Sequence, residues 1–163
     1  MPRRANAGFA LMLSLLVACQ PVLNWREVRP VGSGAAALFP CKPDVEQRAG
    51  MGLAHCQAGT MEFALSWADL PDPTQAGAAL RAMPLALATR LKLPLLPGPT
   101  LQVPGMTPLP DAAQHWLSGK DGVTHVAVFS HGGRVYQALM RTGLDDGVAW
   151  DSFVKGLRVE PAR

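Results

Sequence analysis

The sequence predicts an α+β fold, in which an antiparallel sheet of about six to seven strands carries one long helix and one short C-terminal helix. Three segments support this prediction. In residues 61–67 apolar and polar side chains alternate, as in a strand with one buried face. Residues 76–91 repeat apolar side chains at helical spacing. Residues 113–141 hold three strand-like runs separated by short turns, which is typical of an antiparallel meander.

The first eighteen residues have the layout of a secretory signal peptide. Arg3 and Arg4 precede an apolar run from Phe9 to Ala18 that only Ser14 interrupts. This run of about ten residues is half of the roughly 20 that a membrane-spanning helix needs. We therefore expect a cleaved export signal rather than a permanent membrane span.

The end of this signal, Leu16-Val17-Ala18-Cys19, resembles the bacterial lipobox. Cys19 would supply the thiol that takes the diacylglyceryl group, and the small Ala18 would let the peptidase reach the bond before Cys19. An ordinary signal that ends beside a chance cysteine is the alternative. The next residue is Gln20 rather than Asp, which in lipoproteins of this kind implies sorting to the outer membrane of a Gram-negative host. We expect an exported protein, anchored to the outer membrane through lipid on Cys19 and facing the periplasm.

We expect three parts in the chain: a signal peptide at 1–18, a lipidated tether at 19–31 and a single globular domain at 32–163. Two of the 15 basic residues lie in the signal, which leaves 13 against 12 acidic residues in the mature chain. No basic run interleaved with aromatic residues follows, so nucleic acid is not an expected partner. The expected partners are the membrane, through the lipid, and an envelope protein or a small ligand.

The first half of the domain is expected to be rich in strands. The tether before it has room for a first strand at 24–28. Within the domain, a short strand is predicted at 35–39, and a hairpin pairs residues 45–47 with 51–56 through a turn at Ala49-Gly50. The strand at 61–67 follows, with Met61, Phe63, Leu65 and Trp67 on its buried face.

The hairpin brings Cys41 beside Cys56, and export delivers both to an oxidising compartment. We therefore expect a disulfide between them. The alternative is a metal site that includes His55 and Cys56, but the spacing of a CxxC or HxxxH site is missing.

Asp72 as N-cap and Pro73 as first helical residue predict the start of the long helix. Pro84 should kink this helix or divide it in two. Six prolines in residues 94–110 predict a stiff surface crossing, with room for an edge strand at 101–103. The meander strands are expected at 113–118, 123–130 and 135–141, followed by a short helix over 146–155 and a last strand at 157–159.

The sequence offers no catalytic motif, and we expect no cofactor and no metal. Ser130 and His131 are neighbours on a strand, so they should point to opposite faces, and no G-x-S-x-G motif surrounds the serine. His115 and His125 could approach each other across the sheet, but no third metal ligand is evident. We interpret these two histidines as exposed polar neighbours.

Asp145 and Asp146 resemble a carboxylate pair, but acidic residues at a helix start are stabilised by the helix dipole. The candidate ligand-binding residues are aromatic or basic: His115, Trp116, Arg141 and Trp150. We expect them to share one cleft if the domain binds a ligand.

The order of these elements resembles that of small, mostly uncharacterised proteobacterial outer-membrane lipoproteins. The matching segments are "NWREV", "ALFPCKPD", "HCQAGTMEFALSWADLPDP", "FSHGGRVYQALM" and "FVKGLRV". The resemblance covers nearly all of the mature chain and implies a PsbP-like α/β/α layout, an antiparallel sheet covered by helices. Folds of this kind serve as assembly factors, binding modules or structural lipoproteins, so the resemblance implies a non-catalytic binding or structural role. The alternative is a hydrolase-like envelope enzyme whose active site is assembled from scattered residues.

Overall fold

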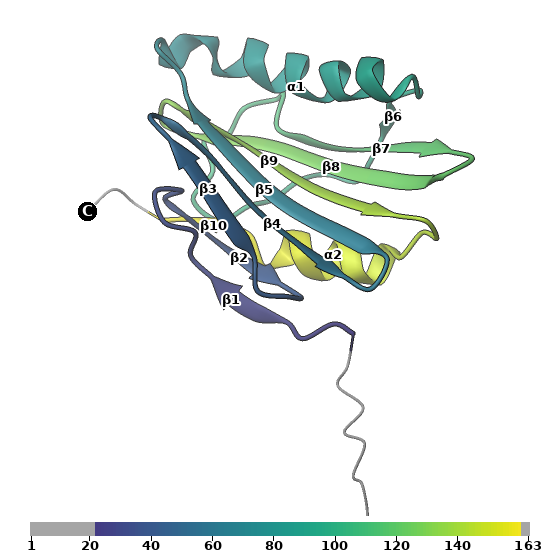
Figure 1. Ribbon diagram of the computed structural model, residues 1–163. Helices are drawn as coiled ribbons and strands as arrows, with labels where there is room; N and C mark the ends of the chain where they lie inside the picture. The colour runs from purple at the N-terminus through teal and green to yellow at the C-terminus, as the bar shows by residue number, and fades with distance from the viewer. Residues whose placement is uncertain (1–21, 161–163) are drawn as a thin grey trace, which may run out of the picture.

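A computed structural model describes residues 22–160, with a seven-stranded sheet as the middle of three layers (Figure 1). Helix α1 (Ala76–Leu91) covers one face of this sheet. Helix α2 (Gly147–Lys155) and a separate three-stranded sheet lie on the other face. The predicted α+β class, with one long and one short helix, is confirmed.

The large sheet is antiparallel throughout and has the strand order β3-β4-β5-β9-β8-β7-β6. The hairpin at Ala49-Gly50 and the three-stranded meander are confirmed. The strands β5 and β9 pair at the centre, from Glu62 opposite Arg141 to Asp69 opposite Arg134. The bounds are β3 Asp44–Arg48, β4 Met51–Ala58, β5 Met61–Asp69, β6 Leu96–Pro97, β7 Ala113–Gly119, β8 Gly122–His131 and β9 Arg134–Thr142.

The small sheet consists of β1 (Arg26–Val28), β2 (Ala35–Phe39) and β10 (Arg158–Val159), with β2 in the middle. Trp25, just before β1, packs edge-on against Phe63 of the large sheet at 5.8 Å between ring centroids. The folded structure therefore begins before residue 32, where the sequence placed the start of the domain, because residues 24–28 of the expected tether pair and pack with it. Cys19 and the signal lie outside the described residues.

The main core lies between the large sheet and the layer that contains α2. Phe153 of α2 contacts Phe39 at 5.2 Å and Phe63 at 5.3 Å, both in edge-to-face geometry. All three rings are fully buried, and each such side chain stabilises the fold by about 2–3 kcal/mol. The aromatic contacts fasten α2 and the small sheet to the large one.

Asp72 caps the helical segment as predicted, because its Oδ1 accepts a hydrogen bond from the backbone N–H of Thr74. A short 3₁₀ turn, η1 (Pro73–Gln75), leads into α1. Pro84 does not divide the helix, which runs as one element through it. The proline ring is buried, and this apolar contact offsets the backbone hydrogen bond that its nitrogen cannot make. No helix within residues 22–160 is long and apolar enough to cross a membrane.

The prediction of an edge strand at 101–103 is wrong, because these residues form no strand. The edge is formed instead by β6, whose Leu96 lies opposite Trp116 of β7. Leu101 and Val103 are buried in the main core, so their apolar character reflects packing beneath a loop rather than strand pairing.

The disulfide between Cys41 and Cys56 is confirmed, with 6.0 Å between the two Cα atoms. Cys41 follows β2 of the small sheet, and Cys56 lies on β4 of the large sheet. The bond therefore ties the two sheets together covalently.

Replacing Cys41 by serine should lower the free energy of unfolding by about 3 kcal/mol, the value that the chain-entropy model gives for a closed loop of about 15 residues. Urea unfolding of the exported domain measures this loss. The reduced wild-type protein is the control and should lose a similar amount. Equal stability of the oxidised wild type and the Cys41→Ser variant would contradict the prediction.

Candidate functional site

The face of the large sheet that carries α1 is only partly covered. α1 lies over β8 and β9 (Figure 1), and side chains of β3, β4 and β5 line the open space beside it. Two hollows of about 340 and 300 Å³ lie there, and they share Leu53 and Ser66. Together they form one groove beside α1, which we call the α1 groove.

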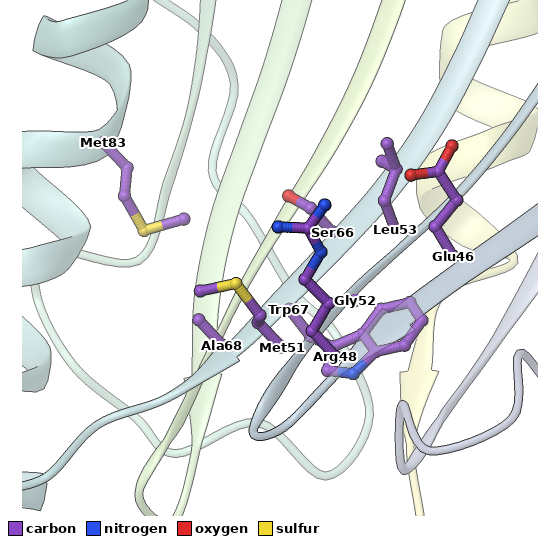
Figure 2. A pocket seen from close by; sticks show the side chains of 9 residues that line it. All are labelled: Glu46, Arg48, Met51, Gly52, Leu53, Ser66, Trp67, Ala68 and Met83. Carbon is purple, nitrogen blue, oxygen red and sulfur yellow. The ribbon is translucent and has the colours of Figure 1, made fainter.

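The first hollow has mainly apolar walls (Figure 2). Met83 of α1 faces Met51 and Ala68 of the sheet across the open space. Arg48 and Glu46 of β3 bring charge to its rim. The volume falls in the lower part of the usual range for ligand sites, and flexible methionine side chains adapt to irregular apolar occupants.

The second hollow continues the groove toward the opposite end of the sheet. Leu87 and Leu91 of α1 form its apolar wall, and Arg90, Arg141 and Glu62 bring charge to it. The α1 groove is therefore mainly apolar in the first hollow and mixed in the second, where Thr124 and Gln137 add polar groups to the charged ones.

Alternation along β4 explains why apolar side chains line an open surface. Its inward side chains, such as Ala54 and Cys56, are buried in the main core, so Met51 and Leu53 must point to the α1 side. Gly52 lies between these two residues, and a Cβ there would overlap the indole of Trp67. The buried Trp67 thus packs against Gly52 on the main-core face of the sheet, behind the backbone that floors the first hollow.

The four predicted ligand-binding residues do not share one cleft. Trp116 and Trp150 lie on the α2 side of the large sheet, where both contact the ring of His125. His115 precedes Trp116 on the same strand and so points to the α1 side, as does Arg141 in the second hollow. The four residues therefore form no cluster, because the sheet separates the two tryptophans from His115 and Arg141.

His125 is buried, so its interpretation as an exposed histidine is wrong. Its ring stacks on Trp150 at 5.3 Å, and its Nε2 donates a hydrogen bond to Asp145 at 2.7 Å. The Nε1 of Trp150 donates to the side-chain oxygen of Gln114 at 2.8 Å. These satisfied contacts fix the first turn of α2 against the sheet.

The other histidine of that pair, His115, lies opposite Val126 rather than His125. Burial lowers the pKa of His115 below its ordinary value. Asp146 caps α2 by accepting a hydrogen bond from the backbone N–H of Ala149 at 2.9 Å, as its place at a helix start predicted. Asp145 has the separate role of pairing with His125.

Ser130 and His131 do not form a nucleophile and base. The Ser130 Oγ is buried and has no hydrogen-bond partner in the described structure. The His131 Nδ1 donates to the carbonyl oxygen of Gly105 at 2.7 Å, so it is directed toward the loop rather than toward the serine. Within residues 22–160, no three His, Cys, Asp or Glu side chains gather as metal ligands.

A second polar cluster joins the two sheets. The guanidinium of Arg134 donates to both oxygens of Asp69, at 2.6 and 2.9 Å, and to the backbone carbonyls of Gly32 and Ser33. The Tyr136 hydroxyl donates to the same Ser33 carbonyl at 2.8 Å. The Arg134 guanidinium holds the pKa of Asp69 below its ordinary value. We interpret this cluster as a structural connection, because its donors are satisfied within the protein.

A scan against protein-family models finds no match for the chain, and a search of curated proteins finds none. Among solved structures, the chain is similar to cyanobacterial PsbP (CyanoP) from Synechocystis sp. PCC 6803, with a TM-score of 0.50 over 90% of this chain and 98% of that one. The fold is PsbP-like. Sequence identity is 10%, so the likeness concerns the fold alone.

A second structure, from Bacteroides thetaiotaomicron VPI-5482, aligns with a TM-score of 0.44 and 11% identity, over 80% of this chain and 47% of that one. This weaker likeness carries no argument about the chain.

Sequence reasoning did not identify the α1 groove of this PsbP-like domain. The available signal was the pair Met51 and Leu53, two large apolar residues at positions that alternate with the buried face of β4. What the sequence could not supply was the position of α1, which brings Met83 opposite them.

The Arg134 cluster predicts a dependence of stability on pH. Because the folded-state pKa of Asp69 is lowered, its contribution is present above the unfolded-state pKa and is lost as pH falls through the folded value. Asp69→Asn should therefore cost about 1 kcal/mol or less at pH 7, since the pair is partly exposed, and the difference from wild type should shrink at pH 3.

Urea unfolding at several pH values measures that difference. Asp121→Asn is the matched control, because Asp121 makes no salt bridge in the described residues. A difference between wild type and Asp69→Asn that stays the same at pH 3 and pH 7 would contradict the assignment.

Proposed function

We propose that this chain is a periplasm-facing lipoprotein of the outer membrane, whose PsbP-like domain binds a partner without catalysing a reaction. The lipobox-like Leu16–Cys19 segment supports the anchor. The Cys41–Cys56 disulfide fits an exported, oxidising location. Bound lipid chains contribute about 0.8 kcal/mol per buried methylene, so two or more chains would hold the protein on the membrane stably.

The α1 groove is the observation that supports binding. Its two hollows meet at Leu53 and Ser66, so the occupant it fits is elongated. We propose that this occupant is an extended segment of an envelope protein, with apolar side chains in the first hollow and both polar and apolar side chains in the second. Arg48 and Glu46 at one end, and Arg90 at the other, would contact the polar groups that flank such a segment.

The hydrolase-like alternative has less support from the side chains. A serine hydrolase needs its nucleophile within reach of both a base and solvent. Ser130 is buried and His131 is bonded to a loop carbonyl, so this pair lacks that arrangement. A binding role needs only the complementary surface that the α1 groove provides.

Cys19→Ala should accumulate as an unprocessed precursor without lipid, because the alanine has no thiol to acylate. Intact-mass measurement of the membrane fraction checks this. Cys41→Ser is the control and should still carry the acyl mass. A wild-type mature chain that begins at another residue and has no acyl mass would rule out the anchor.

The groove can be tested in living cells with a photo-crosslinking amino acid. Met83→p-benzoylphenylalanine should yield one specific protein adduct, whereas Leu85→p-benzoylphenylalanine, on the exposed side of the same helix, should not. Adding Met51→Asp should reduce the adduct about tenfold, because it places a charge in the apolar wall.

Identical adducts at positions 83 and 85 would contradict a specific groove partner. An adduct with a small molecule rather than a protein would contradict the proposed class of occupant. A protein adduct that Met51→Asp leaves unchanged would place the contact outside the groove.

A further inference from the structure

The start of the described chain lies close to the proposed lipid anchor. Only residues 20 and 21 separate Cys19 from Val22, so the Cα atoms of Cys19 and Val22 are at most about 11 Å apart. Val22 itself lies against the turn between β4 and β5, where a Cβ on Gly59 would be 3.0 Å from its Cγ1. Lipid on Cys19 would therefore hold this turn within a short distance of the bilayer.

Strand pairing brings two further turns to the same end of the large sheet. Glu62, just after the β4–β5 turn, lies opposite Arg141 near the end of β9, and Thr142 lies opposite Val123 at the start of β8. The β7–β8 turn and the segment 143–146 before α2 therefore lie at this end as well (Figure 1). We call it the anchor end.

The anchor end carries the two most exposed large apolar side chains among the described residues, Leu144 at 86% and Val148 at 79%. Val22, at the same end, is 64% exposed. The backbone carbonyl of Leu144 accepts a hydrogen bond from the Thr142 hydroxyl at 2.6 Å, so the segment that presents this leucine is fixed to the end of β9. Leu144 and Val148 lie four residues apart in this one segment, beside the proposed anchor, so together they form the part of the surface best placed to bury apolar area in a membrane.

We propose that the anchor end is a membrane-docking surface, with Leu144 and Val148 inserted among the lipid headgroups and upper acyl chains. This inference rests on the proposed lipidation of Cys19, which brings the surface to the bilayer. The charged residues nearby have both signs, with Lys120 and Arg141 alongside Asp121 and Asp145. The surface therefore suits a zwitterionic bilayer, and docking depends on apolar insertion rather than on anionic lipid.

The test uses the mature lipidated protein in nanodiscs of phosphatidylethanolamine and phosphatidylcholine. A small fraction of the lipid carries a gadolinium chelate on its headgroup, and NMR reports which backbone amides are broadened. Docking predicts strong broadening around residues 59, 144 and 148. Amides around residue 31 should be unaffected, because they lie far from the bilayer. Arg134 donates a hydrogen bond to the carbonyl oxygen of the neighbouring Gly32, which holds this segment at the opposite end of the sheet.

Leu144→Ser combined with Val148→Ser separates docking from simple tethering. Both side chains are exposed, so the fold should be retained while the broadening at 143–148 falls about tenfold. Val31→Ser is the matched control, since Val31 is 74% exposed at the far end, and should leave the profile unchanged.

Intact mass, measured first, distinguishes the two proposals. Acylated Cys19 with a broadening profile that is uniform, or unchanged by the double serine variant, would overturn the docking surface and leave the anchor standing. A mature chain without acyl mass would overturn both.

Discussion

The pairing of β5 with β9 is the constraint on which the rest of the structure depends. It joins the N-terminal hairpin strands to the C-terminal meander and makes one sheet of two locally folded units. It also fixes which side chains face which layer. Phe63 and Met140 of this pair enter the main core beside α2, whereas Ala64 and Leu139 face α1 and the groove. The same strand pair thus supplies side chains to the floor of the groove on one face of the sheet and to the core on the other.

The parts of this fold that follow local rules could be predicted from the sequence. The alternation of apolar and polar residues predicts β5, the turn residues Ala49-Gly50 predict the β3–β4 hairpin, and Asp72 predicts the start of the helical segment. The hairpin also brought Cys41 to Cys56. Parts that depend on distant contacts could not be predicted in this way. The sequence predicts a strand at 24–28 but not that Trp25 packs it onto Phe63, and it does not show that Pro84 stays buried within one continuous helix.

The candidate site shows the same division. The alternation rule that found β5 also separates His115 from Trp116, yet the residue types alone suggested that they act together. The α1 groove exists because one helix is narrower than the sheet. A helix about 10–12 Å wide cannot cover seven strands spaced about 4.8 Å apart. Part of one sheet face is left open, and the apolar Met51 and Leu53 on β4 mark it. Only the position of α1 decides which strands these are.

The α1 groove runs alongside β5, from Glu62 near the anchor end to Ala68 near the far end. At about 3.4 Å per residue, the stretch from Glu62 to Ala68 spans roughly 20 Å. In a domain docked through Leu144, the groove runs away from the membrane surface. Arg141 lies at its membrane-proximal end and Arg48 at its distal end. A partner segment bound along it would then run roughly perpendicular to the membrane, with one end near the lipid headgroups and the other facing the periplasm.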